Sequence, residues 1–212
     1  MPTITAIKAQ RKNAQRVSIF LDGEFAFGLT RIVAGWLQVG QILDEEKIAR
    51  LKAEDELEMA YLRAVNFLSY RPRSTAEVRQ NLRKYKVPAL LIEPTIERLV
   101  EKNFLNDLEF AKFWVENRNA FRPRGGRALK IELRQKGISD EIIEEVLEAL
   151  VDEESLAYQA GLKRAKKLAR YDWQDFRKKL GAFLARRGFS YAVISPLLPR
   201  LWDEVKGETE SE

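Results

Sequence analysis

The sequence predicts a mainly α-helical protein, with three tandem three-helix repeats forming an elongated array behind a small N-terminal segment that contains a β-hairpin. Two observations predict this architecture. Apolar residues and an Arg-Pro-Arg motif recur at a spacing of 51 residues, and an Asp-Gly pair separates two runs of strand-forming residues near the N-terminus. Repeats of this kind bury their apolar faces against neighbouring repeats, and three units meet the minimum for a stable array.

The N-terminal segment, residues 1–55, has the pattern of a small sheet. Residues 17–21 and 24–28 are rich in β-forming side chains, and Asp22-Gly23 between them suits the positive φ angles of a tight two-residue turn. We expect residues 4–9 to add a third strand. One or two short helices are expected within residues 29–51, leading into the repeats.

Columns of apolar residues define the period. Leu82, Leu133 and Leu184 are each 51 residues apart, and the Arg-Pro-Arg motif recurs at the same offset. The three units are therefore placed at residues 57–106, 107–154 and 155–202, followed by an acidic tail, 203–212, that we expect to be frayed. The other columns are Val87, Ile138 and Phe189; Ile92, Ile143 and Ile194; Ile96, Leu147 and Leu198; and Leu99, Leu150 and Leu201.

Each unit is predicted to contain three helices. In the first unit, a helix runs from about Glu56 to Ser69, Ser74 and Glu77 form a capping box that opens the second helix, and the third follows Pro88. In the later units, glycine ends the middle helix and serine caps the next, at Gly137 and Ser139 and again at Gly188 and Ser190. Pro94 and Pro196 indicate either a kink or a late helix start, and both remain open.

The composition argues against several classes of function. The chain has no cysteine and no histidine, so disulfides, thiol chemistry and the commonest general base are absent. It has no apolar run long enough to span a membrane and no signal-peptide pattern at its start, so we expect a soluble, cytoplasmic protein. We expect no enzyme activity, no cofactor, no small-molecule substrate and no metal site. The densest carboxylate cluster, on a solvated helix face, is Glu141, Glu144, Glu145 and Glu148.

Charge is distributed unevenly among the units. The whole chain carries a net charge of +5, whereas the first, second and third units carry +4, −4 and +9. Basic residues at helical spacing in the third unit are typical of a surface that binds a polyanion, and Tyr171 and Trp173 in the intervening loop could stack on a base. Contact with nucleic acid, contact with an acidic protein groove and simple solvation all remain open. The basic residues are Lys163, Lys166, Lys167, Arg170, Arg177, Lys178, Arg186 and Arg187.

The Arg-Pro-Arg motifs also have two interpretations. Proline can stiffen a turn that holds both arginines toward a carboxylate or phosphate, or it can end a helix whose last carbonyls the arginines bind. Three more basic residues along the helix after the second motif favour binding there. The candidates are Arg71 and Arg73 in the first motif, Arg122 and Arg124 in the second, and Arg127, Lys130 and Arg134 beyond it.

Three tryptophans lie within apolar helical patterns, which favours a place in the core over a role in ligand stacking. They are Trp36, Trp114 and Trp202.

Two segments, LSYRPRSTAEVRQNLRKYKVP and DLEFAKFWVENRNAFRPRGGRALKIELRQKGIS, resemble the RecX regulatory protein family, which modulates the RecA recombinase. The resemblance is clearest over residues 57–152. The third unit diverges, because Tyr171-Asp172-Trp173 stands where an Arg-Pro-Arg would fall, although its Leu-Ala-Arg-Arg-Gly-Phe segment fits. The N-terminal strands resemble an extension seen in longer members of the family.

The resemblance implies a non-enzymatic regulator that lies along the groove of the RecA–DNA filament and restrains ATP hydrolysis, strand exchange and co-protease activity. It therefore implies a role in the regulation of recombination, DNA repair and the SOS response. The uneven charge of the units is compatible with contact both to protein and to single- or double-stranded DNA within the filament. Two alternatives are an autonomous, sequence-nonspecific single-stranded nucleic-acid-binding protein and a helical adaptor for an unrelated protein.

Overall fold

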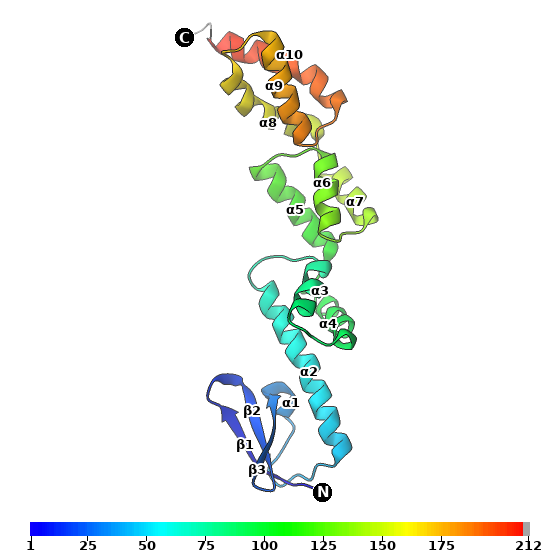
Figure 1. Cartoon of the computed structure of the whole chain (residues 1–212). Coiled ribbons are helices and arrows are strands. Elements are labelled where there is room, and N and C mark those ends of the chain that lie inside the picture. Colours follow the sequence, from blue (N-terminus) through cyan, green and yellow to red (C-terminus); the bar gives the residue numbers. More distant parts are fainter. Residues whose placement is uncertain (210–212) are drawn as a thin grey trace. The chain divides into compact units, whose positions relative to one another are not determined.

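The computed structural model describes residues 1–209 and confirms a mainly helical chain with a small antiparallel sheet at its N-terminus (Figure 1). The chain divides into two compact units. The first unit comprises Met1–Arg73 and Val78–Leu105, and the second comprises Ser74–Glu77 and the chain from Asn106 onward. Over residues 1–209, none of the helices is long and apolar enough to cross a membrane.

The sheet contains β1 (Ile4–Gln10), β2 (Asn13–Leu21) and β3 (Glu24–Thr30), paired antiparallel in that order. The predicted hairpin is confirmed, because Asp22 and Gly23 have φ angles of 48° and 94° and join β2 to β3. The predicted third strand is also confirmed, as β1. Alternate side chains of the sheet, including Ile4, Ile19 and Leu29, are fully buried in a small core.

Two helices follow the sheet, α1 (Arg31–Ala34) and α2 (Glu45–Leu68). The helix that we expected to begin near Glu56 begins instead at Glu45, because the Asp44 carboxylate caps it by accepting from the Lys47 amide at 2.7 Å. Its early turns pack on the sheet through Leu51. The expectation that Trp36 fills a core is wrong, since it follows the short α1 and its side chain is 90% exposed.

The first unit also contains α3 (Thr75–Lys84), apart from its first turn, and α4 (Ala89–Glu101). Leu82 of α3 and Ile92 and Leu99 of α4 pack against the second half of α2. Pro94 lies inside α4, so a late start of this helix is excluded. Proline has no amide hydrogen, so the helical hydrogen bond from residue 94 to the Leu90 carbonyl is lost. Leu90 lies on the exposed side of the helix, where water can bind its carbonyl.

The second unit contains two sets of three helices. The first set is α5 (Asp107–Phe121), α6 (Gly126–Gln135) and α7 (Asp140–Leu150), and the second is α8 (Glu153–Ala165), α9 (Trp173–Arg186) and α10 (Tyr191–Thr209), with the 3₁₀ turn η1 (Lys166–Leu168) after α8. Each set has its own apolar core. The column residues Leu133 and Leu184 are fully buried in these two cores.

Helix α10 changes two expectations. Pro196 and Pro199 both lie inside it, so a late start is excluded here as well. The tail that we expected to be frayed from residue 203 continues this helix to Thr209, because Val205 is buried and the Tyr158 hydroxyl donates to Glu204 at 2.8 Å. The part of that expectation that concerns residues 210–212 lies outside the described residues.

Candidate functional site

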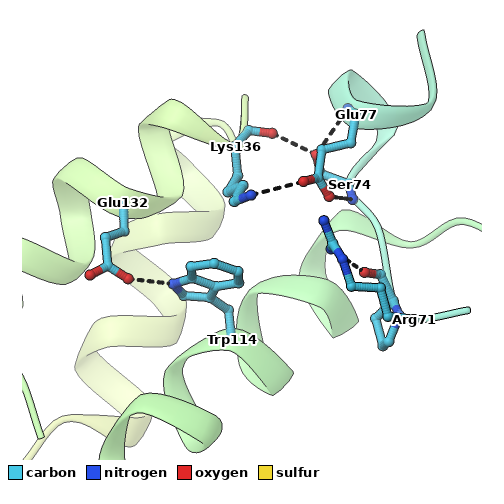
Figure 2. A network of polar contacts seen from close by, with 7 residues as sticks. Arg71, Ser74, Glu77, Trp114, Glu132 and Lys136 are labelled. Carbon is cyan, nitrogen blue, oxygen red and sulfur yellow. Dashed lines mark hydrogen bonds and ion pairs between the residues drawn. The ribbon is translucent and has the colours of Figure 1, made fainter. Parts of the chain in front are cut away.

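The capping box predicted at Ser74 is present and is joined to Lys136, the residue that caps the C-terminus of α6 (Figure 2). The Glu77 amide donates to the Ser74 hydroxyl at 3.2 Å, and the Ser74 amide donates to the Glu77 carboxylate at 3.3 Å. The Ser74 hydroxyl in turn donates to the Lys136 carbonyl at 2.6 Å, while the Lys136 ammonium lies 2.8 Å from Glu77. This network fixes the turn that follows the first Arg-Pro-Arg motif.

A second network surrounds Glu132, whose carboxylate accepts from three side chains. The Trp114 indole donates to it, in the hydrogen bond drawn in Figure 2, and the length of this bond is 2.8 Å. The Arg118 guanidinium donates to it at 2.8 Å, and the Arg124 guanidinium lies 2.6 Å away. Trp114 packs against the core of this helix set, as predicted from the sequence. The guanidinium of Arg124 is therefore paired with a carboxylate of the same chain, although its side chain is partly exposed, and this pairing favours a structural role for the second arginine of the motif.

The backbones of successive repeats meet at Gly125. Its amide donates to the Arg187 carbonyl at 3.0 Å, and the Arg187 guanidinium donates to the Pro123 carbonyl at 3.1 Å. Gly188 has a φ of 87°, and a Cβ placed there would lie 2.5 Å from the Ala128 side chain. This close approach holds the second Arg-Pro-Arg loop against the end of α9, so the loop has a fixed position relative to the third repeat.

A concave surface with a volume of about 360 Å³ lies beside this junction, and we call it the basic hollow. Its lining brings together four of the basic residues singled out from the sequence, on the α5–α6 loop, α8, η1 and the end of α9. Among the residues that the structure describes, the lining includes no acidic side chain. The residues that define the hollow are Arg122, Lys163, Arg164, Lys167, Arg187 and Phe121.

The electrostatics of the basic hollow are unbalanced. Partial burial lowers the pKa of the Arg187 guanidinium, and the positive charges of Arg124 and Arg122 lower it further. Burial is the larger cause of this shift, and the charged neighbours that contribute to it are both cations, while the described lining residues of the hollow include no acidic side chain. The hollow is therefore suited to an anion, and the planar guanidinium groups of Arg122 and Arg187 suit the oxygens of a phosphate or carboxylate.

A second concave surface, of about 820 Å³, lies between α9 and α10, and we call it the α9–α10 groove. Three of the predicted residues are on its lining, namely Arg127 at the start of α6 and Arg177 and Lys178 on α9. Unlike the basic hollow, this groove has an apolar lining between its cations, including Phe189 and Ile194.

The structure assigns other predicted site residues to contacts within the chain. Lys130 lies 3.1 Å from Glu144, and Arg134 forms two hydrogen bonds with Asp140, at 2.7 and 3.0 Å. These pairs are partly or fully exposed and leave the cations accessible from solvent. Elsewhere, Arg71 donates to the Pro72 carbonyl, Arg73 lies over the Phe67 ring and Arg170 contacts Tyr171, while Lys166 and Arg186 are exposed but line neither the hollow nor the groove.

The aromatic residues of the third repeat differ from expectation. Trp173 is not in a free loop but begins α9, where its ring packs against Phe176 and against Trp202 at centroid distances of 6.3 and 5.6 Å. Trp202 is thus part of the core, as expected. The lining residues that sequence reasoning missed are Arg164, adjacent to Lys163, and the exposed Phe121 and Tyr191.

The glutamates of α7 do not gather into a cluster that could bind a metal. Glu144 pairs with Lys130, and the Ser139 hydroxyl lowers the pKa of Glu141. Within residues 1–209, no group of three or more acidic side chains has the arrangement of a metal site.

Comparison with known proteins identifies the same modular organisation. Family models match in four places: the regulatory protein RecX N-terminal domain at residues 2–44, and the first, second and third three-helix domains of RecX at 60–99, 106–147 and 152–198. Over its full length, the chain is 36% identical to "Regulatory protein RecX" of Bacillus pumilus and 35% identical to that of Bacillus subtilis, and it covers 82% of each.

Two solved structures are similar as well. One, described as the crystal structure of regulatory protein RecX, matches with a TM-score of 0.77 and 27% identity over 93% of this chain and 98% of the other. The second, RecX from Lactobacillus salivarius, matches with a TM-score of 0.63 and 28% identity over 70% of this chain and 97% of the other.

Proposed function

This chain belongs to the RecX family of regulatory proteins, and on that premise we propose that it regulates the RecA recombinase by binding the RecA–DNA filament along its groove. We propose further that binding restrains the ATPase, strand-exchange and co-protease activities of the filament. The chain would act by binding alone, as a non-enzymatic regulator. A partner assembled on DNA also implies that the protein works in the cytoplasm.

The observation that carries this proposal is the basic hollow. Five cations line it, and no acidic side chain among its described lining residues balances their charge. A phosphate of the filament's DNA would supply the missing negative charge, and its oxygens match the guanidinium groups of Arg122 and Arg187. Phosphate contacts of this kind position a protein on DNA without reading sequence, which suits a regulator of filaments on any DNA.

A titration of RecA ATPase activity on single-stranded DNA tests the proposal. We expect the wild-type chain to lower the rate in a saturable way, and the Lys167→Glu variant to need a higher concentration for half of the effect. Lys112→Glu is the matched control, because Lys112 is a half-exposed lysine on α5 whose charge change is the same but which does not line the hollow. An ATPase rate that the wild-type chain leaves unchanged would contradict the proposed function.

One observation favours the second candidate, an autonomous single-stranded nucleic-acid-binding protein. The Phe121 ring at the basic hollow is 78% exposed, and an exposed aromatic ring beside cations can stack on an unpaired base. Affinity for a bare single strand, measured across salt concentrations, separates the two candidates. Micromolar or tighter binding without RecA favours the second, whereas weak binding that strengthens on filaments favours the first.

A further inference from the structure

The α9–α10 groove differs in chemistry from the basic hollow, and this difference carries a further inference. One wall is a face of α9 that carries three small residues, Gly181, Ala182 and Ala185. Ala185 follows the other two by about one helical turn, and both alanines are exposed. The other wall is formed by Ile194 and Leu198 of α10. Small side chains on one wall leave room for the backbone or side chains of another segment to approach closely.

Three cations line the groove together with these apolar residues. Arg127, Arg177 and Lys178 contribute to the groove, all three are exposed, and the groove-lining residues in the described part of the chain include no carboxylate. Tyr191, which is 74% exposed, adds a hydroxyl beside them. The combination of an apolar floor with unopposed cations is complementary to a segment that carries both apolar and acidic side chains.

We propose that the α9–α10 groove docks an acidic amphipathic segment of the partner protein. An apolar side chain of that segment packs between Ala182 and Leu198, and its carboxylates pair with Arg127, Arg177 and Lys178. The proposal rests on the proposed function in one respect, namely that the partner carrying the segment is the recombinase. The two concave surfaces then divide the work: the basic hollow takes DNA phosphate, and the groove takes protein.

The aromatic packing favours a peptide over a nucleic acid in this groove. Stacking of successive bases requires several rings with a free face. Among the described lining residues, Tyr191 has an exposed ring, but Phe189 is buried and Trp173 packs against both Phe176 and Trp202 and is only partly exposed. The floor is instead aliphatic, and aliphatic side chains bury apolar anchors of a peptide, which a phosphodiester backbone does not offer. The cations add orientation and a faster association rate to that anchor.

Two variants of the full-length chain separate these possibilities. Ala182→Arg fills the groove while raising its positive charge, and arginine is a good helix former at an exposed site. Arg177→Glu combined with Lys178→Glu leaves the apolar floor open but reverses the charge beside it. Arg186→Glu is the control, because Arg186 is exposed on the same helix and lines neither the groove nor the basic hollow. Circular dichroism of each variant checks that the helices are retained.

In the RecA ATPase titration, we expect Ala182→Arg and the double charge reversal each to raise the half-maximal concentration by roughly tenfold, the loss typical of removing one well-packed anchor. Arg186→Glu should change it by less than about threefold, as expected for a charge outside the contact. If the double reversal weakens the effect but Ala182→Arg does not, the groove binds an anion without an apolar anchor and the inference is wrong. Wild-type behaviour of both variants would also overturn it.

A second measurement needs no recombinase and keeps the groove testable if the proposed function fails. Anilinonaphthalene sulfonate combines an apolar ring system with one anion, so it has the chemistry inferred for the docked segment. We expect it to bind the wild-type chain saturably with a rise in fluorescence, and Ala182→Arg to abolish that rise while Arg186→Glu retains it. Equal fluorescence from wild type and Ala182→Arg would show that the groove is not such a site, whatever the chain does to RecA.

Discussion

The amide of Gly125 donates a hydrogen bond to the carbonyl of Arg187 at 3.0 Å, and this bond joins the loop of one repeat to the helix end of the next. Gly125 has an ordinary φ of −74°, so its glycine is not required by backbone conformation. It is required by space, because a Cβ at this position would lie 2.5 Å from the backbone nitrogen of Phe189 and from the carbonyl carbon of Gly188. These close atoms are backbone atoms of one peptide group, which cannot move aside as a flexible side chain could.

Gly125→Ala should therefore destabilise the chain by about 1–3 kcal/mol, the usual cost of overpacking a closely packed site. Urea unfolding followed by circular dichroism measures the change. Gly207→Ala is the matched control, since within residues 1–209 no atom beyond its chain neighbours and the nearby backbone of its own helix lies within 4 Å of an added Cβ, and alanine is the better residue inside a helix. If the two variants unfold at the same urea concentration, the contact at Gly125 is looser than the structure indicates.

The Ser74 hydroxyl has two roles that a single substitution removes together. It caps α3 by accepting from the Glu77 amide, and it donates to the Lys136 carbonyl. We expect Ser74→Ala to lower the free energy of unfolding by about 1–3 kcal/mol, because the variant loses a cap and leaves the partly buried Lys136 carbonyl without this donor. The control is Ser69→Ala, whose hydroxyl forms one exposed bond to the Asn66 carbonyl and should matter by less than about 0.5 kcal/mol.

The two arginines of the second motif should have different roles, one in binding and one in stability. Arg122 is exposed at the basic hollow, so Arg122→Ala should weaken the effect on RecA while leaving the unfolding midpoint nearly unchanged. Arg124 is paired with Glu132, so Arg124→Ala should lower the free energy of unfolding by about 1 kcal/mol and change the titration less. The RecA ATPase titration and urea unfolding of both variants test this difference. A reversed pattern would place Arg124 rather than Arg122 in contact with the partner.

The elements that sequence reasoning predicted correctly have either a local or a periodic signal. The Asp22-Gly23 turn and the Ser74 capping box depend on residues close together in the chain, and the structure confirms both. The 51-residue period compares distant positions, and its residues Leu82, Leu133 and Leu184 are all fully buried. The early start of α2 also had a local signal, because Asp44 and the two glutamates after it have the pattern of a capped N-terminus. The exposure of Trp36 had none, since α1 is too short for periodicity to show which face is buried.

The division of the basic residues between two surfaces could not be predicted from spacing. Helical periodicity grouped Lys163 with Lys167 but passed over Arg164, which lines the basic hollow because α8, the α5–α6 loop and α9 meet there. It also could not reveal that Arg124 pairs with Glu132, because that partner is on the next helix. Tertiary packing decides which cations are neutralised and which remain available, and this information lies in contacts between segments distant in the sequence.

The exposed pair formed by Asp140 and Arg134 predicts a small dependence of stability on pH. The hydrogen bonds from Arg134, and its positive charge, lower the pKa of Asp140 below its ordinary value, which is about 3.9 in unfolded chains. Because the pKa is lower in the folded state, the pair stabilises the fold fully above the unfolded value and loses its effect as the pH falls through the folded value. Asp140→Asn should then unfold at a lower urea concentration than wild type near pH 7.

The same difference should vanish near pH 2, where both chains carry an uncharged side chain at position 140. Arg134→Ala should remove most of it as well, and adding Asp140→Asn to that variant should then have only a small further effect, because Lys130 also lowers the pKa of Asp140. A difference between Asp140→Asn and wild type that persisted unchanged at low pH would mean that the carboxylate acts through something other than its charge.

The basic hollow predicts how binding to DNA depends on salt. Each phosphate that a lysine or arginine neutralises releases bound counterions, so the logarithm of the affinity falls with the logarithm of the salt concentration by about 0.7 per contact on a single strand.

Lys163→Ala and Lys167→Ala should each flatten that slope by roughly this amount for filaments assembled on single-stranded DNA, and the double variant by roughly twice as much. Fluorescence anisotropy of the labelled chain at several salt concentrations measures the slope. Arg177→Ala, which alters a cation of the α9–α10 groove, should lower the affinity but change this slope much less, because its proposed partner is a carboxylate of protein and not a DNA phosphate. Equal slopes for wild type and the double lysine variant would contradict the proposal that the basic hollow binds DNA phosphate.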